Sequence, residues 1–220
     1  MINEKDKDGD YTDLRPKRIG ILGGTFNPLH MGHLIMAEEV CKHHHLSKVI
    51  FIPAYIPPHK STENLADALH RYQMVKEAIS GNEIFEVSDF EIKREMKSYT
   101  IDTVQDLLRL YGKDSEVYLI MGADSLNELE LWKDIKRLSQ LCHFVIVNRP
   151  GFSTEASPRL TELIGDDNIV DIEKLRIEIE PVGISSTDIR KRLKEGTEIK
   201  GLVPECVEAY IKKHGLYSPA

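Results

Sequence analysis

The stretch from Arg18 to Val40 constrains this chain most, because an apolar run ends there in glycines and a helical pattern follows at once. The run at 19–22 predicts a short buried strand, which the glycines at 23 and 24 break. The Asn27-Pro28 pair then predicts the start of a helix that extends to about residue 45, with Asn27 as its N-cap. A strand, a glycine turn and a helix start together form an anion site, because unpaired backbone N–H groups and the helix dipole favour negative charge.

Two histidines, His30 and His33, lie at the start of this predicted helix and share one face of it, because they are three residues apart. Gly32 between them is a poor helix former, which indicates that another group approaches closely there. The combination favours a site for a phosphate under attack over a structural core. A zinc site is the weaker alternative, since no cysteine or carboxylate follows at a metal-binding spacing.

Length and composition set outer limits on the function. The 220 residues suit one sizeable α/β domain or two small ones, and the net charge of −7 argues against a general nucleic-acid-binding protein. The three cysteines are scattered, which favours reduced thiols in a cytoplasmic protein. An apolar run of about 18 residues, as a membrane span needs, does not occur. We therefore expect neither nucleic acid nor membrane as a partner.

The first 17 residues alternate acids and bases without apolar periodicity, and they lack the apolar core of a secretory signal. We therefore expect a flexible N-terminal tail at 1–17 and a single domain over 18–220.

Further apolar patterns predict the other elements. The run at 48–52 predicts a second strand, parallel to the first because a helix lies between them. A helix is expected over 66–80, with Leu69, Tyr72, Val75, Ala78 and Ile79 on its buried face. The remaining expected strands are 84–90, 117–121, 142–147, 169–172 and 175–179, the last as an edge, and the remaining expected helices begin near 98–100, 153, 185 and 204.

The segment G-G-T-F-N-P-L-H-M-G-H at 23–33 resembles the signature of the HxGH nucleotidyltransferase superfamily. This resemblance implies an α/β, Rossmann-like fold, with a doubly wound, mostly parallel sheet and helices on both faces. Many members have Asp where this chain has Asn27, and both residue types can cap a helix. The resemblance also implies contacts to the triphosphate from Gly23, Gly24, Thr25, Phe26, His30 and His33.

A second superfamily signature, I-S-S-T-D-I-R, lies at 184–190. It predicts a helix capped by Ser185, Ser186 or Thr187, with Arg190 one turn further on. The resemblance implies that these four residues hold the β- and γ-phosphates of ATP. Both signatures must then converge on one triphosphate.

Segments between the two signatures resemble bacterial nicotinate-nucleotide adenylyltransferases: P-P-H-K at 57–60, S-Y-T-I-D-T at 98–103, M-G-A-D-S-L at 121–126 and R-P-G at 149–151. For Asp124 a simple N-cap is the alternative to a ribose contact, and for Trp132 a core position is the alternative to stacking on a pyridine. The resemblance implies a phosphate contact from Lys60, and acceptor contacts from Tyr99, Thr100, Asp102, Thr103, Gly122, Asp124, Trp132 and Arg149.

The activity that the resemblance implies is transfer of AMP from ATP to nicotinate mononucleotide, giving nicotinate adenine dinucleotide and pyrophosphate. His30, His33, Lys60 and Arg190 would carry catalysis, and Mg²⁺ would arrive on the ATP phosphates without a metal site of the protein. The alternatives are a sibling enzyme that uses nicotinamide mononucleotide, phosphopantetheine, or glycerol phosphate with CTP, and a nucleotide-sensing module without turnover. The oligomeric state stays open, with a homo-oligomer as one alternative.

Overall fold

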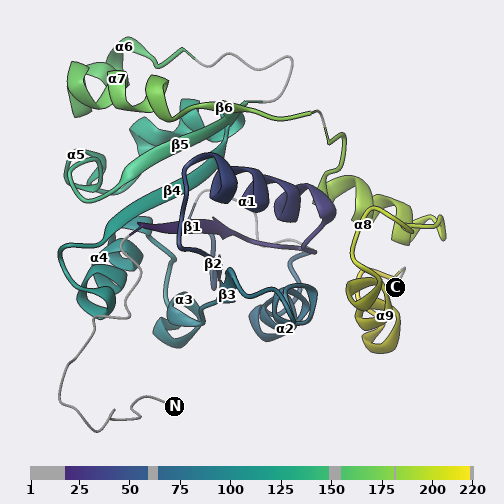
Figure 1. Ribbon diagram of the computed structural model, residues 1–220. Coiled ribbons are helices and arrows are strands. Elements are labelled where there is room, and N and C mark those ends of the chain that lie inside the picture. The colour runs from purple at the N-terminus through teal and green to yellow at the C-terminus, as the bar shows by residue number, and fades with distance from the viewer. Residues whose placement is uncertain (1–17, 59–63, 149–154, 181, 219–220) are drawn as a thin grey trace, which may run out of the picture.

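A computed structural model of the protein describes residues 18–58, 64–148, 155–180 and 182–218. Within these residues, one six-stranded parallel sheet has the order β3-β2-β1-β4-β5-β6 (Figure 1). The chain winds from the centre to one edge, returns, and winds to the other edge, which is the Rossmann order. The strands are β1 (Arg18–Gly24), β2 (Lys48–Pro53), β3 (Phe85–Val87), β4 (Glu116–Gly122), β5 (His143–Asn148) and β6 (Ile177–Glu178).

Both faces of the sheet are buried. Because successive residues of a strand point to opposite faces, one strand contributes side chains to two separate cores. On β4, Ile120 belongs to one hydrophobic core, and Leu119 and Met121 belong to the other. The first core is completed by helices α1 (Met31–His43), α2 (Ala68–Ala78), α8 (Ser186–Lys194) and α9 (Glu205–His214). The second is completed by α4 (Thr100–Tyr111), the 3₁₀ helix η1 (Ala123–Leu131), α5 (Ile135–Leu138), α6 (Pro158–Ile164) and α7 (Asp166–Leu175). The predicted doubly wound α/β fold is confirmed.

The predicted start of the first helix is wrong. The helix begins at Met31 with His30 at the N-cap position, and the Asn27-Pro28 peptide bond is cis. Asn27 is buried, and its side chain donates to the carbonyl of Asn64 and accepts from the backbone N–H of Ala66. These distant partners use the polar atoms that an N-cap would have turned to its own helix.

The strand predicted at 169–172 is also wrong, because this segment lies within α7. Ile169 and Ile172 both pack on the core, and their spacing of three residues fits one face of a helix. The apolar residues at 169, 170 and 172 form too short a run to distinguish a strand from part of a helix. Phe90 begins a short helix, α3 (Phe90–Arg94), and does not extend β3.

The buried face of α2 differs from the predicted one. Leu69 is 66% exposed, whereas Arg71 is 1% exposed and faces inward with Met74 and Val75. The apolar pattern misplaced this face because a charged residue occupies one of its central positions.

The tail predicted at 1–17 lies outside the described residues. In the described part of the chain, helices are either too short or too polar to cross a bilayer.

Candidate active site

The candidate site lies at the carboxyl ends of the central strands. Gly24 ends β1 and Gly122 ends β4, and these two neighbouring strands are where the winding direction reverses. Ligands of open α/β sheets bind at such a switch point. The amino ends of α1 and η1 follow these strand ends directly or after a short turn, so their backbone N–H groups face the same edge.

The glycine turn leaves its backbone accessible. A Cβ atom placed on Gly23 would meet no other atom within 4 Å, whereas one on Gly24 would lie 3.3 Å from the ring of Phe26. Phe26 has a φ of 47° and is buried, so its ring anchors the turn to the core while Gly23 stays open. Phe26 therefore fixes the turn to the core, while the backbone at Gly23 is accessible to a ligand.

His30 and His33 form a stacked pair at the start of α1. Their ring centroids lie 3.7 Å apart with an interplanar angle of 26°. The backbone N–H of His30 donates to Nδ1 of His33 over 3.2 Å, so in the neutral imidazole of His33 the proton sits on Nε2. His33 can therefore present an N–H donor at the helix start, where an anion is favoured.

The expectation of close approach at Gly32 is confirmed. A Cβ atom on Gly32 would lie 3.1 Å from Nδ1 of His30 and 3.6 Å from Cγ1 of Val182. The neighbour that approaches is thus the imidazole itself, together with the segment that leads into α8.

The two signature segments come together as expected. The Ser186 hydroxyl donates to the Pro28 carbonyl over 2.9 Å, and Nη1 of Arg190 donates to the Asn27 carbonyl over 2.8 Å. Ser185 is the N-cap of α8, and its hydroxyl accepts from the N–H of Asp188. Nη2 of Arg190 also donates to the Thr187 hydroxyl. Two helix starts, α1 and α8, are thereby joined around the turn at 27–28.

A further residue of this region, Arg71, was missed by the sequence reasoning. Its buried guanidinium donates to the carbonyls of Thr25 at 2.8 Å, Ala66 at 2.8 Å and Tyr55 at 3.1 Å. Burial lowers its pKa. One side chain of α2 therefore links the glycine turn to the segment that leaves β2. A charged residue between apolar positions of an amphipathic pattern was the available signal.

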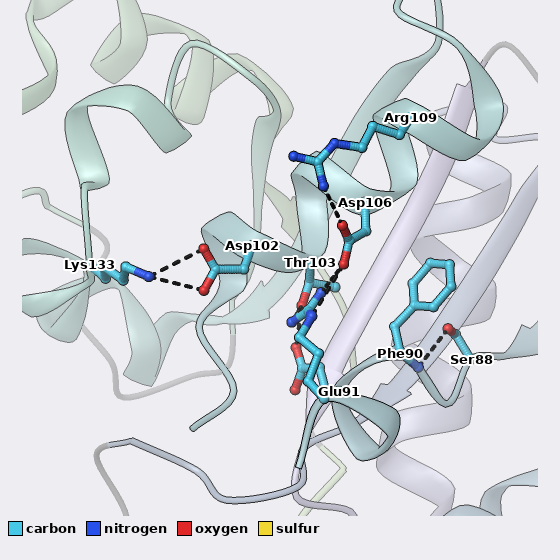
Figure 2. Close-up of polar contacts among 9 residues, drawn as sticks. Ser88, Phe90, Glu91, Asp102, Thr103, Asp106, Arg109 and Lys133 are labelled. Atoms are coloured by element: carbon cyan, nitrogen blue, oxygen red, sulfur yellow. Dashed lines mark hydrogen bonds and ion pairs between the residues drawn. The ribbon is translucent and has the colours of Figure 1, made fainter. Parts of the chain in front are cut away.

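Four of the predicted acceptor residues lie at the amino end of α4, where Tyr99 is the N-cap position and Thr100 the first residue, followed by Asp102 and Thr103. Nζ of Lys133 lies 3.0 Å from an oxygen of Asp102 (Figure 2). The same Nζ lies 4.6 Å from the centroid of the Tyr99 ring. Tyr99, Thr100 and Asp102 are each partly exposed. Lys133 brings the segment after η1 to this helix start, and the sequence reasoning had not assigned it a role.

Thr103 lies apart from these neighbours. It is 2% exposed, and its hydroxyl donates to Glu91 and accepts from Arg94 within the protein. In the structure its side chain therefore faces Glu91 and Arg94 on the buried side of α4.

Gly122 is the N-cap position of η1, and the Asp124 carboxylate folds back over it: a Cβ atom on Gly122 would lie 2.4 Å from Oδ1 of Asp124. Asp124 is exposed and is the second residue of η1, so it does not occupy the N-cap position. Trp132 is partly buried against the second core at the end of η1. Lys60 and Arg149 lie outside the described residues.

A groove of about 950 Å³ lies elsewhere, at the amino ends of β4 and β5. Its lining includes Val117, His143 and Asp171, with Nδ1 of His143 2.7 Å from the Asp171 carboxylate. The amino ends of parallel strands lack both the switch-point helix starts and the signature residues. The carboxyl edge is therefore the stronger candidate.

Comparison with known proteins shows the family to which the chain belongs. Residues 21–192 match the cytidylyltransferase-like family. A probable nicotinate-nucleotide adenylyltransferase of Moorella thermoacetica is 46% identical over 206 residues, covering 93% of this chain and 94% of the relative. One from Desulfitobacterium hafniense is 46% identical over 207 residues, covering 92% and 96%.

The fold has solved counterparts as well. The nicotinic acid mononucleotide adenylyltransferase of Plasmodium falciparum, complexed with NaAD, superposes with a TM-score of 0.71 over 91% of this chain and 97% of that chain. At 21% sequence identity, this similarity shows the shared fold alone.

Proposed function

Because the chain belongs to the nicotinate-nucleotide adenylyltransferase family, as its sequence signatures had suggested, we propose that it transfers AMP from ATP to nicotinate mononucleotide. The products are nicotinate adenine dinucleotide and pyrophosphate, so the reaction belongs to NAD biosynthesis. The observation that carries this proposal is the convergence of α1 and α8, through Ser186 on Pro28 and Arg190 on Asn27. It provides one anion-binding site whose donors are imidazole, hydroxyl, guanidinium and backbone N–H groups.

The proposed step is an in-line displacement at the α-phosphorus of ATP. An oxygen of the acceptor phosphate forms the new P–O bond, and the bond to the bridging oxygen of the β-phosphate breaks, with its electrons leaving on pyrophosphate. The acceptor oxygen is already anionic, so the step needs no general base. Catalysis then rests on positioning and on stabilising the charge that develops.

His33 suits this task because its ring is oriented before substrate binds. With Nδ1 accepting from the His30 backbone, Nε2–H is the donor that would meet the α-phosphoryl oxygens. Arg190 and the amino end of α8 would hold the β- and γ-phosphates and stabilise the departing pyrophosphate. Lys60 stays a predicted phosphate contact.

The amino end of α4 is the proposed site of the pyridine carboxylate. Its backbone N–H groups and the partly exposed Thr100 hydroxyl are donors, which favour a carboxylate over an amide. Trp132 is the proposed stacking partner of the pyridine, and Gly122, Asp124 and Arg149 remain proposed acceptor contacts.

Magnesium is expected to enter with ATP. Residues 23–33 offer imidazole, hydroxyl and amide groups but no carboxylate, and carboxylates are the ligands that a protein site for Mg²⁺ requires. The donor set of this turn therefore does not form a dedicated magnesium site, and the ion would be carried by phosphate oxygens and water.

An acceptor panel tests the proposal. Pyrophosphate release is measured with ATP and Mg²⁺ plus nicotinate mononucleotide, nicotinamide mononucleotide or phosphopantetheine, and with CTP plus glycerol phosphate. We expect the highest kcat/KM with nicotinate mononucleotide and no release without an acceptor. A preference for another acceptor would identify a sibling enzyme, and ATP binding without turnover of any acceptor would identify a sensing module.

A further inference from the structure

A buried carboxylate, Glu91 of α3, lies beneath the proposed acceptor site. It is 7% exposed, and the Thr103 hydroxyl of α4 donates to its Oε1 over 2.7 Å (Figure 2). Burying a carboxylate is costly unless hydrogen bonds compensate for the lost water. The hydrogen bond from Thr103 offsets part of that cost for Glu91.

Two buried hydroxyl residues stand at the two ends of the acceptor segment. Ser98 precedes Tyr99, and Thr103 follows Asp102. Ser98 and Thr103 are buried, whereas the residues between them include the partly exposed Tyr99, Thr100 and Asp102. Through Thr103, Glu91 therefore holds one end of the segment whose partly exposed side chains form the amino end of α4.

Neighbouring hydrogen bonds determine the direction in which the Thr103 hydroxyl donates. Nη1 of Arg94 donates to Oγ1 of Thr103 over 3.0 Å, so the hydroxyl hydrogen of Thr103 is left for Glu91. Arg94 is held in turn by Asp106, with Nη2 2.6 Å from the carboxylate. The order Asp106–Arg94–Thr103–Glu91 links the second turn of α4 back to α3.

The support also reaches the segment after β2. The backbone N–H of Tyr55 donates to the Ser98 hydroxyl over 2.9 Å, and the N–H of Ser98 donates to the Ile56 carbonyl over 3.0 Å. Burial raises the pKa of Glu91, while the hydroxyls of Thr103 and Ser98 and the charge of Arg94 act in the opposite direction.

We infer that Glu91 is a positioning residue for the nicotinate mononucleotide acceptor, acting through Thr103 on the helix start that receives the pyridine carboxylate. Glu91 touches no substrate, and Thr103 acts from below the site. The inference rests on the proposed function, because it concerns the acceptor of that same reaction. It assigns acceptor affinity to a carboxylate buried behind the binding surface.

Glu91→Gln is the direct test, because it keeps the shape and removes one acceptor. The Glu91 carboxylate is a charged acceptor for the Thr103 hydroxyl, whereas the neutral amide of glutamine has one oxygen and one NH₂ group that cannot accept, so the bond to Thr103 is weakened or lost. We expect the KM for nicotinate mononucleotide to rise about tenfold, with kcat and the KM for ATP unchanged to within about threefold.

The matched control is Glu86→Gln. The Glu86 carboxylate accepts from the Tyr111 hydroxyl at the other end of the same helix, so it interacts with α4 away from the acceptor. Glu86→Gln should leave all three kinetic constants unchanged, and equal effects of the two variants would overturn the inference.

A second pair of variants keeps the test decisive if Glu91→Gln does not fold. Thr103→Val removes the hydroxyl and should raise the acceptor KM about tenfold, whereas Thr103→Ser restores the hydroxyl and should return that KM to within about twofold of wild type. Loss of thermal stability without a change in acceptor KM would make the network merely structural and would overturn the inference.

The same assay distinguishes failure of the proposed function from failure of the inference about Glu91. Wild-type protein that does not turn over nicotinate mononucleotide would overturn the proposed function and with it the inference. Wild-type protein that turns it over, while Thr103→Val retains the wild-type acceptor KM, would overturn the inference alone.

Discussion

At the scale of single residues, the start of α1 determines the chemistry that His33 can offer. The N–H of His30 is one of the helix's first donors, and it uses Nδ1 of His33 as its acceptor. A bond that completes the helix start thus also selects the ring tautomer. The edge of the Phe26 ring, 5.1 Å from His33 between centroids, packs against the same imidazole.

Replacing His33 by alanine should lower kcat at least about 10²-fold, because it removes a donor aimed at the charge of the transition state. The measurement is steady-state pyrophosphate release with saturating ATP and nicotinate mononucleotide. His43→Ala, an exposed histidine at the other end of α1, is the control and should keep wild-type kcat. A His33→Ala enzyme within a few-fold of wild type would remove this imidazole from the mechanism.

At the scale of elements, one arginine of α2 fixes two segments beside the site. The carbonyls of Thr25, Tyr55 and Ala66 belong to segments outside the strands and helices. The Arg71 guanidinium donates a hydrogen bond to each of them. Its planar, five-donor guanidinium can serve carbonyls in three directions, which the ammonium of lysine reproduces poorly.

Arg71→Met should lower the free energy of unfolding by about 3 kcal/mol, because three partly buried carbonyl groups lose their donor at about 1 kcal/mol each. Urea unfolding followed by circular dichroism measures this change. Lys76→Met, on an exposed position of the same helix, should change stability by less than about 0.5 kcal/mol. Similar losses in both variants would show that the guanidinium bonds contribute little.

At the scale of the whole molecule, His44 connects the end of α1 to the end of α7. It is buried, and its Nε2 donates to the Leu175 carbonyl over 2.8 Å. Burial lowers its pKa below 6.5, and the nearby positive groups His43, Arg18 and His45 act in the same direction, whereas the bond to Leu175 opposes them. The folded protein therefore favours the neutral imidazole.

Stability should consequently fall as the pH drops below about 6.5. A group with a lowered pKa in the folded state contributes stability above its unfolded pKa and loses it as the pH falls through the folded value. Urea unfolding at pH 7.5 and 5.5 should show this decrease in wild type and a smaller one in His44→Gln, which keeps a donor but does not titrate. His43→Gln, at an exposed position, should retain the full decrease, and an unchanged pH dependence in His44→Gln would contradict the assignment.

Much of the fold and part of the site were predictable from sequence, where the signal was local. Buried strands such as 48–52 and 117–121 are compact apolar runs, and the cap of α8 at Ser185 lies next to the turn that it stabilises. The strand predicted at 169–172 was wrong because so short an apolar run does not distinguish a strand from part of a helix.

The sequence by itself determined the alternation of strands and helices, the family, and the two signature segments of the site. Only the tertiary structure decided which face of the S-Y-T-I-D-T segment is exposed, and which distant groups use Asn27 and Arg71. The physical reason is the range of the interactions: caps and periodicity act over a few residues, whereas the partner of a buried polar atom is set by segments that meet only when the sheet is assembled. Thr103 illustrates this limit, since its hydroxyl meets Glu91 only once α3 and α4 have packed together.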